Sequence, residues 1–265
     1  MLAPGPFRVE HIRPGDPYEL SNGHAIECST TGGDGARANS AGAMVIDSDP
    51  DVDSSGIDAG FTLGPGHLRA PDVAVGVPDR PGFVPGVPPL AIEYAGSGQN
   101  EDDLKEKIAE FLGAGTKYIW VVRLVGPRRV EVYEPGKKMR IVKAGKTLSA
   151  PGVLRNTYPV EALFERGAAR EATLRNLLQR EGYESLDSVR EEGREEGREE
   201  GREEGREEGR VDGLRVALSG LIAGIGAPVS AALQARMLSE TDEGTLLRWI
   251  HRVPGAKRLD DIFGP

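Results

Sequence analysis

The sequence predicts a mixed α/β domain over residues 1–165, a charged helical linker over residues 166–213 and a small helical module over residues 214–265. Three observations lead to this prediction. Short strand-like segments, one amphipathic helix and a second series of strands fill the first part of the chain. A Glu-Glu-Gly-Arg motif then repeats five times over residues 191–210, and apolar residues at helical spacing follow it. Strands mixed with a helix favour a sheet with helical cover.

Alternating apolar residues and turn signals mark the first strands. Two strands are expected on either side of Asn22-Gly23 within residues 18–27, because Asn-Gly is a strong hairpin signal. Further strand-like segments occupy residues 60–63, 71–77 and 90–95. Residues 29–60 are rich in Gly, Ser and Asp and lack a clear period, so no element is assigned there. Their Asp-rich part, residues 47–58, is predicted to be an acidic surface loop.

One amphipathic helix is predicted after Asn100. Leu104, Ile108 and Phe111 recur at helical spacing, Asn100 is suited to cap the first turn, and Gly115 lies where the helix should end. Three strand segments then alternate with turn residues and predict a meander over residues 117–125, 128–135 and 137–145.

The negative charge of the chain is concentrated in the repeat. Residues 191–210 contain ten Glu and five Arg, a net charge of −5, so only −4 of the total of −9 lies elsewhere. The acidic balance therefore does not exclude an anionic partner for the domain. Residues 117–146 contain nine Lys and Arg against two Glu, which indicates either a phosphate-binding surface or a solvated sheet face.

Cysteine usage and hydropathy favour a soluble cytoplasmic protein. Cys28 is the single cysteine, so no disulfide within the chain is expected and a reducing compartment fits best. The first residues lack the charged segment and apolar core of a signal peptide, and no apolar run has membrane-spanning length.

The repeat has two interpretations. On a helix of 3.6 residues per turn, its glycines form a slowly winding stripe, and Glu and Arg three residues apart can pair. Each interior glycine costs about 0.8–1.0 kcal/mol relative to alanine, so a solvated, partly helical spacer is favoured. The alternative is a helix that another chain approaches closely along the glycine stripe, although the apolar seam of a coiled coil is missing.

Two carboxylates and one lysine are the strongest candidates for chemistry. Asp72 follows Pro71 at the start of one strand segment, and Glu93 lies late in another. If those strands are neighbours, both carboxylates converge on one hard cation, with the backbone carbonyl of Tyr94 as a third oxygen. Mg²⁺ is usually held by one or two carboxylates, and water and substrate phosphate complete its octahedron. Lys107, on the following helix, would orient the attacking water or neutralise charge on a phosphate.

The helix residues also have a purely structural interpretation. Asp103 and Lys107, like Glu101 and Lys105, are acid-before-base pairs four residues apart, as on many exposed helices. Such surface pairs contribute only about 0.2–0.5 kcal/mol each.

A longer pattern resembles the putative restriction endonuclease family found in many bacteria, a branch of the PD-(D/E)xK nuclease superfamily. The residues that carry the resemblance are Pro71-Asp72, Glu93, Asp103, Lys107, Phe111, Gly115 and Tyr118 to Trp120. The segment YELSNGHAIE is also similar to the family's Tyr-Glu-Leu hairpin, where Glu19 would correspond to an acid near the active site. The resemblance covers residues 15–165 approximately.

The resemblance implies a restriction-endonuclease-like core that cuts a DNA phosphodiester with Mg²⁺ or Mn²⁺. Asp72 and Glu93 would be metal ligands and Lys107 the catalytic lysine. In the superfamily that lysine usually lies two residues after the Glu, where this chain has Ala95; in this family it lies on the helix. Two alternatives remain: a catalytically silent fold that binds nucleic acid or a protein, and a helical scaffold that forms homo-oligomers through the tail.

Overall fold

The computed structural model describes residues 5–28, 30–226 and 228–264. The chain forms two compact units, Met1–Leu186 and Asp187–Pro265. Each unit buries apolar clusters of its own.

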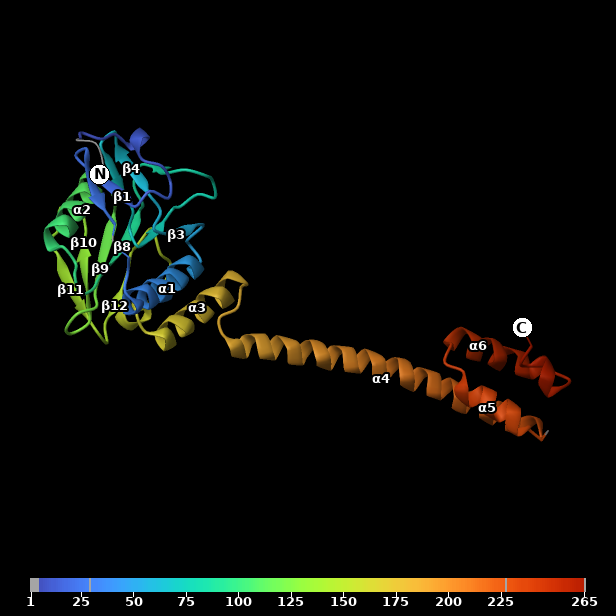
Figure 1. Cartoon of the computed structure of the whole chain (residues 1–265). Coiled ribbons are helices and arrows are strands. Elements are labelled where there is room, and N and C mark those ends of the chain that lie inside the picture. The colour runs from blue at the N-terminus through green and yellow to red at the C-terminus, as the bar shows by residue number, and fades with distance from the viewer. Residues whose placement is uncertain (1–4, 29, 227, 265) are drawn as a thin grey trace. The chain divides into compact units, whose positions relative to one another are not determined.

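The strands of the first unit form two sheets and a separate pair (Figure 1). Within the described residues they are β1 (Tyr18–Ser21), β2 (His24–Glu27), β3 (Ser55–Ile57), β4 (Phe61–Gly64), β5 (His67–Arg69), β6 (Val73–Val75), β7 (Val84–Pro85), β8 (Leu90–Ala95), β9 (Tyr118–Arg123), β10 (Arg129–Tyr133), β11 (Arg140–Lys143), β12 (Thr147–Leu148) and β13 (Tyr158–Pro159). The predicted hairpin, the strand over residues 90–95 and the meander are confirmed.

The larger sheet carries the candidate residues. Its six strands have the order β11-β10-β9-β8-β6-β3; β8 and β9 are parallel and the other neighbours antiparallel. A five-stranded sheet of order β2-β1-β5-β4-β7 contains the N-terminal hairpin, and β12 and β13 form a separate pair. The sheet is thus mixed, as predicted.

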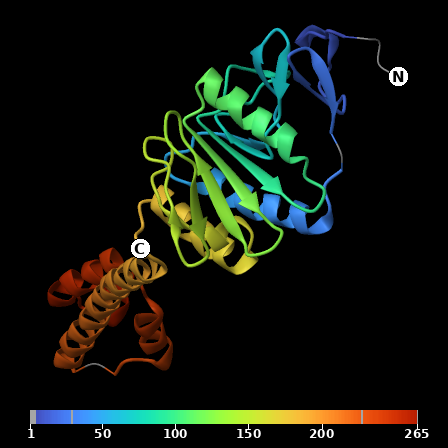
Figure 2. The ribbon, with the colours of Figure 1, turned by 90° about the vertical axis from the view of Figure 1, so that its left-hand side faces the viewer.

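Helices cover both faces of the six-stranded sheet. The helices of this unit are α1 (Gly33–Ser48), α2 (Glu101–Ala114) and α3 (Arg166–Arg180), with 3-10 helices η1 (Val9–His11) and η2 (Val160–Leu163). Helix α1 packs on β6 and β8 with α3 and η2 beside it, whereas α2 contacts β9 from the other side (Figure 2). The side chains of β8 alternate accordingly, because Ile92 joins the core under α1 while Ala91 and Ala95 join the core under α2. Glu93 therefore belongs to the α2 face.

Helix α1 lies in the stretch for which no element was assigned. Its sequence, GDGARANSAGAMVIDS, is dominated by small residues, so it has no strong apolar period. The small residues allow close packing: a side chain at Gly42 would meet the hydroxyl of Tyr94, which donates a 2.9 Å hydrogen bond to the carbonyl of Leu163. Tertiary packing thus stabilises a helix whose sequence mixes alanines, which favour a helix, with glycines, which disfavour it.

The predicted acidic surface loop over residues 47–58 is wrong in part, because residues 47–48 end helix α1, Ser55–Ile57 form β3, and Val52 is buried. Asp49 is completely buried. Its carboxylate accepts hydrogen bonds from the backbone N–H groups of Arg155, at 2.9 Å, and Asn156, at 3.1 Å, and from the hydroxyl of Tyr158. A buried carboxylate needs several donors to offset lost hydration, and these come from residues more than 100 positions away.

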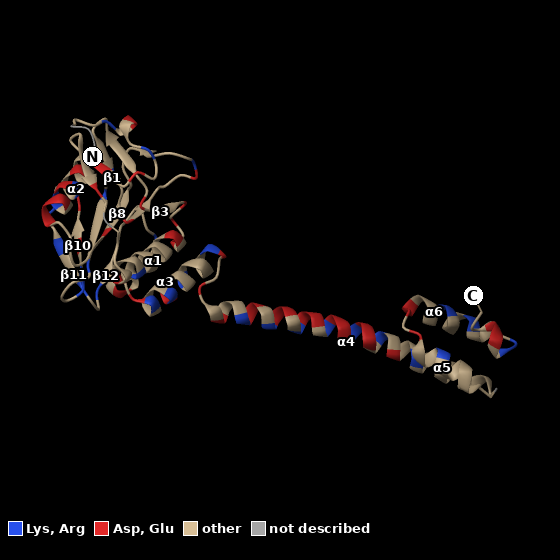
Figure 3. Ribbon diagram, in the orientation of Figure 1, with Lys and Arg blue, Asp and Glu red and all other residues tan. Residues whose placement is uncertain are grey.

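The second unit contains helices α4 (Leu186–Ile225), α5 (Ala231–Ser239) and α6 (Glu243–Arg252), followed by 3-10 helices η3 (Val253–Gly255) and η4 (Leu259–Asp261). The repeat is helical throughout and exposed, and α4 continues across residue 213, where the helical module was predicted to begin. Figure 3 shows acidic and basic residues alternating along α4. Near its end, Leu218 and Ile222 pack with Met237, Leu246 and Trp249 in a small core. No described helix is both long and apolar enough to cross a membrane.

Candidate active site

Strand register brings the two predicted carboxylates together. Strand β6 pairs with β8 so that Val73 lies opposite Ile92. One step further, Asp72 and Glu93 occupy opposite positions at the end of the pairing. Because Val73 and Ile92 both face α1, the two acids point to the α2 face. Both line a cavity of about 710 Å³.

The backbone of Tyr94 contributes to the same place. Its N–H donates to Oδ2 of Asp72 at 2.6 Å, which holds that carboxylate against the end of β8. The N–H and C=O of one strand residue point toward the same neighbouring strand. The carbonyl of Tyr94 is therefore directed to the side of Asp72, whereas the next carbonyl, of Ala95, accepts from Leu124 on the β9 side at 3.0 Å.

Lys107 reaches this pair of carboxylates from α2. The side chain of Asn100 accepts from the N–H groups of Asp102 and Asp103 and so caps the helix, as predicted. Two turns later, Nζ of Lys107 lies 2.8 Å from Oε1 of Glu93 and 3.0 Å from Oε1 of Glu19. It also donates to the carbonyl of Ala70 at 2.7 Å. The lysine is thus directed at the sheet and the hairpin.

Asp103 does not form the surface ion pair with Lys107 that their spacing on the helix would allow. Its carboxylate instead accepts a 2.5 Å hydrogen bond from Nδ2 of Asn100, at the exposed start of the helix. Lys105 does form a surface ion pair, at 3.0 Å, but with exposed Asp102 and not with Glu101, which pairs with Arg123.

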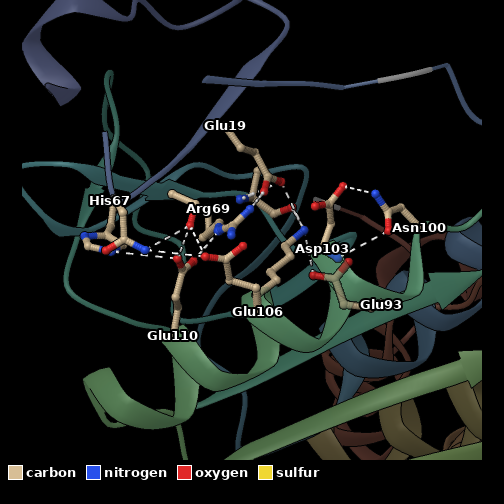
Figure 4. Close-up of polar contacts among 12 residues, drawn as sticks. Glu19, His67, Arg69, Glu93, Asn100, Asp103, Glu106 and Glu110 are labelled. Carbon is tan, nitrogen blue, oxygen red and sulfur yellow. Dashed lines mark hydrogen bonds and ion pairs between the residues drawn. The ribbon is translucent and has the colours of Figure 1, made fainter. Parts of the chain in front are cut away.

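A buried arginine organises the far side of the cavity, and sequence reasoning missed it. Arg69 is 1% exposed, and its Nη1 lies 3.1 Å from Oε2 of Glu19 while its Nε binds Glu110 of α2. The backbone N–H of Ala70 also donates to Glu19, at 3.2 Å. Figure 4 shows Glu19, Arg69 and Glu110 gathered between the hairpin and α2. Glu19 therefore bridges Arg69 and Lys107, near the site as the resemblance implied.

Sequence spacing could not identify this arrangement. Glu19, Arg69 and Glu110 lie on three separate segments, and each is an ordinary charged residue in its local pattern. Strand β5, which carries Arg69, reads only His-Leu-Arg, so its local sequence gives no signal that the arginine is buried.

The electrostatics of the cavity divide its carboxylates into two groups. Burial acts to raise the pKa of Glu19, but the charges of Lys107 and Arg69 together lower it. Burial raises the pKa of Glu93 to about 8, despite Lys107, and Asp72 adds to the increase. Burial likewise raises the pKa of Asp72 and of Asp58, which lines the same cavity. Glu93, Asp72 and Asp58 therefore have less compensating positive charge than their ionised forms require.

The charge on Lys107 is correspondingly stable. Burial acts to lower its pKa, but the carboxylates of Glu93 and Glu19 raise the pKa well above its ordinary value. The lysine remains protonated at neutral pH and is a donor, not a base.

The donor set fits a magnesium or manganese ion. The described residues contain no preformed group of three or more His, Cys, Asp and Glu side chains that could hold a metal. Mg²⁺ does not require such a group, since one or two carboxylates suffice when water and substrate supply the remaining ligands. Asp72 and Glu93 meet that requirement, and a divalent cation between them would supply positive charge that offsets the cost of burying both ionised carboxylates.

Comparison with known proteins shows the family and the fold. No curated protein matches the chain. The crystal structure of a putative nuclease belonging to DUF820 from Anabaena variabilis is similar, with 17% identity over 61% of this chain and 99% of that chain, at a TM-score of 0.54. This similarity confirms the predicted α/β restriction-endonuclease-like fold. The family model described as Uma2, putative restriction endonuclease, matches residues 7–160. The chain therefore belongs to the Uma2 family of putative restriction endonucleases.

Proposed function

We propose that this protein is an endonuclease that hydrolyses DNA phosphodiester bonds with Mg²⁺ or Mn²⁺. Asp72 and Glu93 would hold the metal, with the carbonyl of Tyr94 as a further oxygen ligand. The observation that carries the proposal is a cavity in which two carboxylates lie beside a buried, charged lysine, and in which positive charge does not fully offset the burial of those carboxylates. Perturbed acids of this kind, gathered with a cation in one cavity, are typical of catalytic sites.

In this proposal Asp72 and Glu93 bind the metal, and Lys107 neutralises negative charge. A divalent cation bound there would lower the pKa of a coordinated water and polarise the phosphate. Lys107 keeps its proton, so its ammonium would stabilise negative charge on the phosphate and orient the nucleophilic water through a hydrogen bond. Glu19 and the carbonyl of Ala70 hold that ammonium in place, at 3.0 and 2.7 Å. Glu93 must be ionised to bind the cation, so metal affinity should increase with pH toward about 8.

Nicking of supercoiled plasmid tests this proposal. Wild-type protein should cut with Mg²⁺ or Mn²⁺ and not with EDTA, and Glu93→Gln and Lys107→Ala should each lose the metal-dependent cutting. Lys105→Ala is the matched control, because it removes a lysine two residues away on the exposed side of α2. Loss of cutting in all three variants would contradict the assigned roles. Absence of cutting by the wild type, with salt-sensitive DNA binding retained, would instead support a silent binding module.

We further propose that the tail mediates self-association. The second unit exposes several apolar side chains beside its small core, namely Val216, Leu221, Ile225 and Leu238. The mass of the full chain in solution, compared with that of a Val216→Asp and Leu238→Asp double variant, tests this. An unchanged oligomeric state would contradict a role of the tail in self-association.

A further inference from the structure

A second cavity in the first unit is lined by positive charge. It has a volume of about 560 Å³ and lies where β10 begins and β11 ends. Arg128, Arg129 and Lys143 line it, together with Phe164 and Glu165. Three cationic side chains against one carboxylate give it the opposite charge to the cavity at Asp72 and Glu93.

The pairing of strands places like charges opposite one another at this cavity. Arg129 lies directly across from Lys143 on β11 and from Arg123 on β9. Like charges in directly opposite positions destabilise a sheet. Glu131 relieves part of the repulsion, because it lies 2.9 Å from Arg123 and 3.4 Å from Arg129. A further anion on the Lys143 side would relieve the rest.

The remaining cations lack such compensation. Among the residues that the structure describes, no carboxylate lies within 4.0 Å of the ammonium of Lys143 or the guanidinium of Arg128. The guanidinium carbon of Arg128 instead lies 4.9 Å above the ring of Phe164. A cation–π contact limits the orientations of the guanidinium without neutralising it. A planar guanidinium held in this way is suited to bind phosphate oxygens in pairs.

The cavity and the candidate active site lie at the same end of the sheet, where Phe164 of the cavity belongs to the core under α1 and Glu93 to the α2 face. Pairing aligns Ala95 with Arg123, Arg123 with Arg129, and Arg129 with Lys143 across β8, β9, β10 and β11. Ala95 follows Glu93 by two residues. With about 4.8 Å between neighbouring strands, Lys143 lies roughly 14 Å from Ala95 along this row. One strand of duplex DNA advances about 3.4 Å per phosphate along the helix axis, so a duplex whose axis follows this row would span the distance with about four nucleotides.

We propose that this basic cavity binds the phosphodiester backbone of DNA about four nucleotides from the bond that is cut. Arg128 and Lys143 bind phosphate oxygens there and position the strand without reading its sequence. The assignment rests on the proposed nuclease function for the place of the cut, but backbone binding by the cavity can be measured without any cleavage.

Anisotropy of a fluorescein-labelled 16-base-pair duplex, titrated with full-length protein in EDTA at several salt concentrations, tests the proposal. The double variant Arg128→Gln and Lys143→Gln should bind more weakly, and the slope of log affinity against log salt should fall by about 1.8, as expected for two lost phosphate contacts. The control is Lys117→Gln with Lys138→Gln, which removes the same charge from exposed residues at the opposite end of the sheet.

The outcomes separate this inference from the function on which it rests. An unchanged salt slope in the cavity variant, or an equal fall in the control, would overturn the inference even if the wild type cuts plasmid. A wild type that binds an acidic peptide but no duplex would also overturn it, in favour of a protein partner. If the wild type does not cut plasmid but the cavity variant loses DNA binding, the result would support backbone binding by the cavity and contradict the nuclease proposal.

Discussion

Glu93→Gln should stabilise the metal-free protein, and increasingly so as the pH rises. Glutamine imitates the protonated carboxyl group, which burial favours at this position. The pKa of Glu93 rises from an ordinary 4.5 to about 8 in the folded protein. At about 1.4 kcal/mol for each tenfold change in proton affinity, that increase corresponds to an upper limit of roughly 5 kcal/mol.

The sign follows from which state releases its proton first. Below pH 4.5 the carboxyl group is protonated in both states, so Glu93 adds no pH dependence. Between pH 4.5 and 8 the unfolded chain loses the proton while the folded protein keeps it, so stability falls as the pH rises. Above about pH 8 the folded protein carries the full cost of the buried charge. The variant should lack this part of the pH dependence.

Urea unfolding of the full chain in EDTA at pH 5 and pH 9 measures the difference. Trp120 is buried in the first unit and Trp249 in the second, so a Trp249→Phe background lets Trp120 report on the first unit alone. The variant should gain several kcal/mol over the parent at pH 9 and little at pH 5. Mg²⁺ at 100 times its dissociation constant should stabilise the parent by about 2.7 kcal/mol and leave the variant unchanged. A difference between the two proteins that is independent of pH would refute this reasoning.

Three further substitutions test other parts of the structure, each by urea unfolding. Arg69→Met should destabilise the first unit by about 3–5 kcal/mol, because it leaves the carboxylates of Glu19 and Glu110 without their shared cation; a loss below about 1 kcal/mol would contradict this. Asn100→Ala should lower the free energy of unfolding by about 1 kcal/mol, because the helix cap is lost. No loss would mean that water satisfies the freed N–H groups equally well. Gly42→Ala should be destabilising because its methyl group meets the hydroxyl of Tyr94, and adding Tyr94→Phe should recover part of the loss; no recovery would mean that the hydroxyl is not the obstacle.

Local signals predicted the elements that position the candidate site. The apolar segment that ends in Glu93, the cap at Asn100 and the glycine at 115 each have a short-range physical cause, and β8 and α2 lie where these signals place them. The convergence of Asp72, Glu93 and Lys107 was predicted only on the condition that two strands were neighbours, and that condition holds. Their catalytic roles remain a prediction.

The parts that escaped prediction depend on distant partners. Helix α1 mixes alanines and glycines without a strong apolar period, and Gly42 lets it approach Tyr94 closely. Asp49 is buried because donors from residues 155–158 reach it. Arg69 likewise has partners 41 and 50 positions away. Short-range periodicity contains no information about such contacts.

The repeat in α4 also determines how this helix can change length during evolution. One Glu-Glu-Gly-Arg unit adds about 6 Å to a helix and turns everything beyond it by about 40°. Gain or loss of whole units leaves the charge pattern intact, so copy number is a variable that the helix itself tolerates. Loss of a single residue instead turns the following face by about 100°. Leu218 and Ile222 would then be rotated by that angle about the helix axis relative to the first turns of α4. Changes of four residues rotate them much less and are therefore the smaller perturbation.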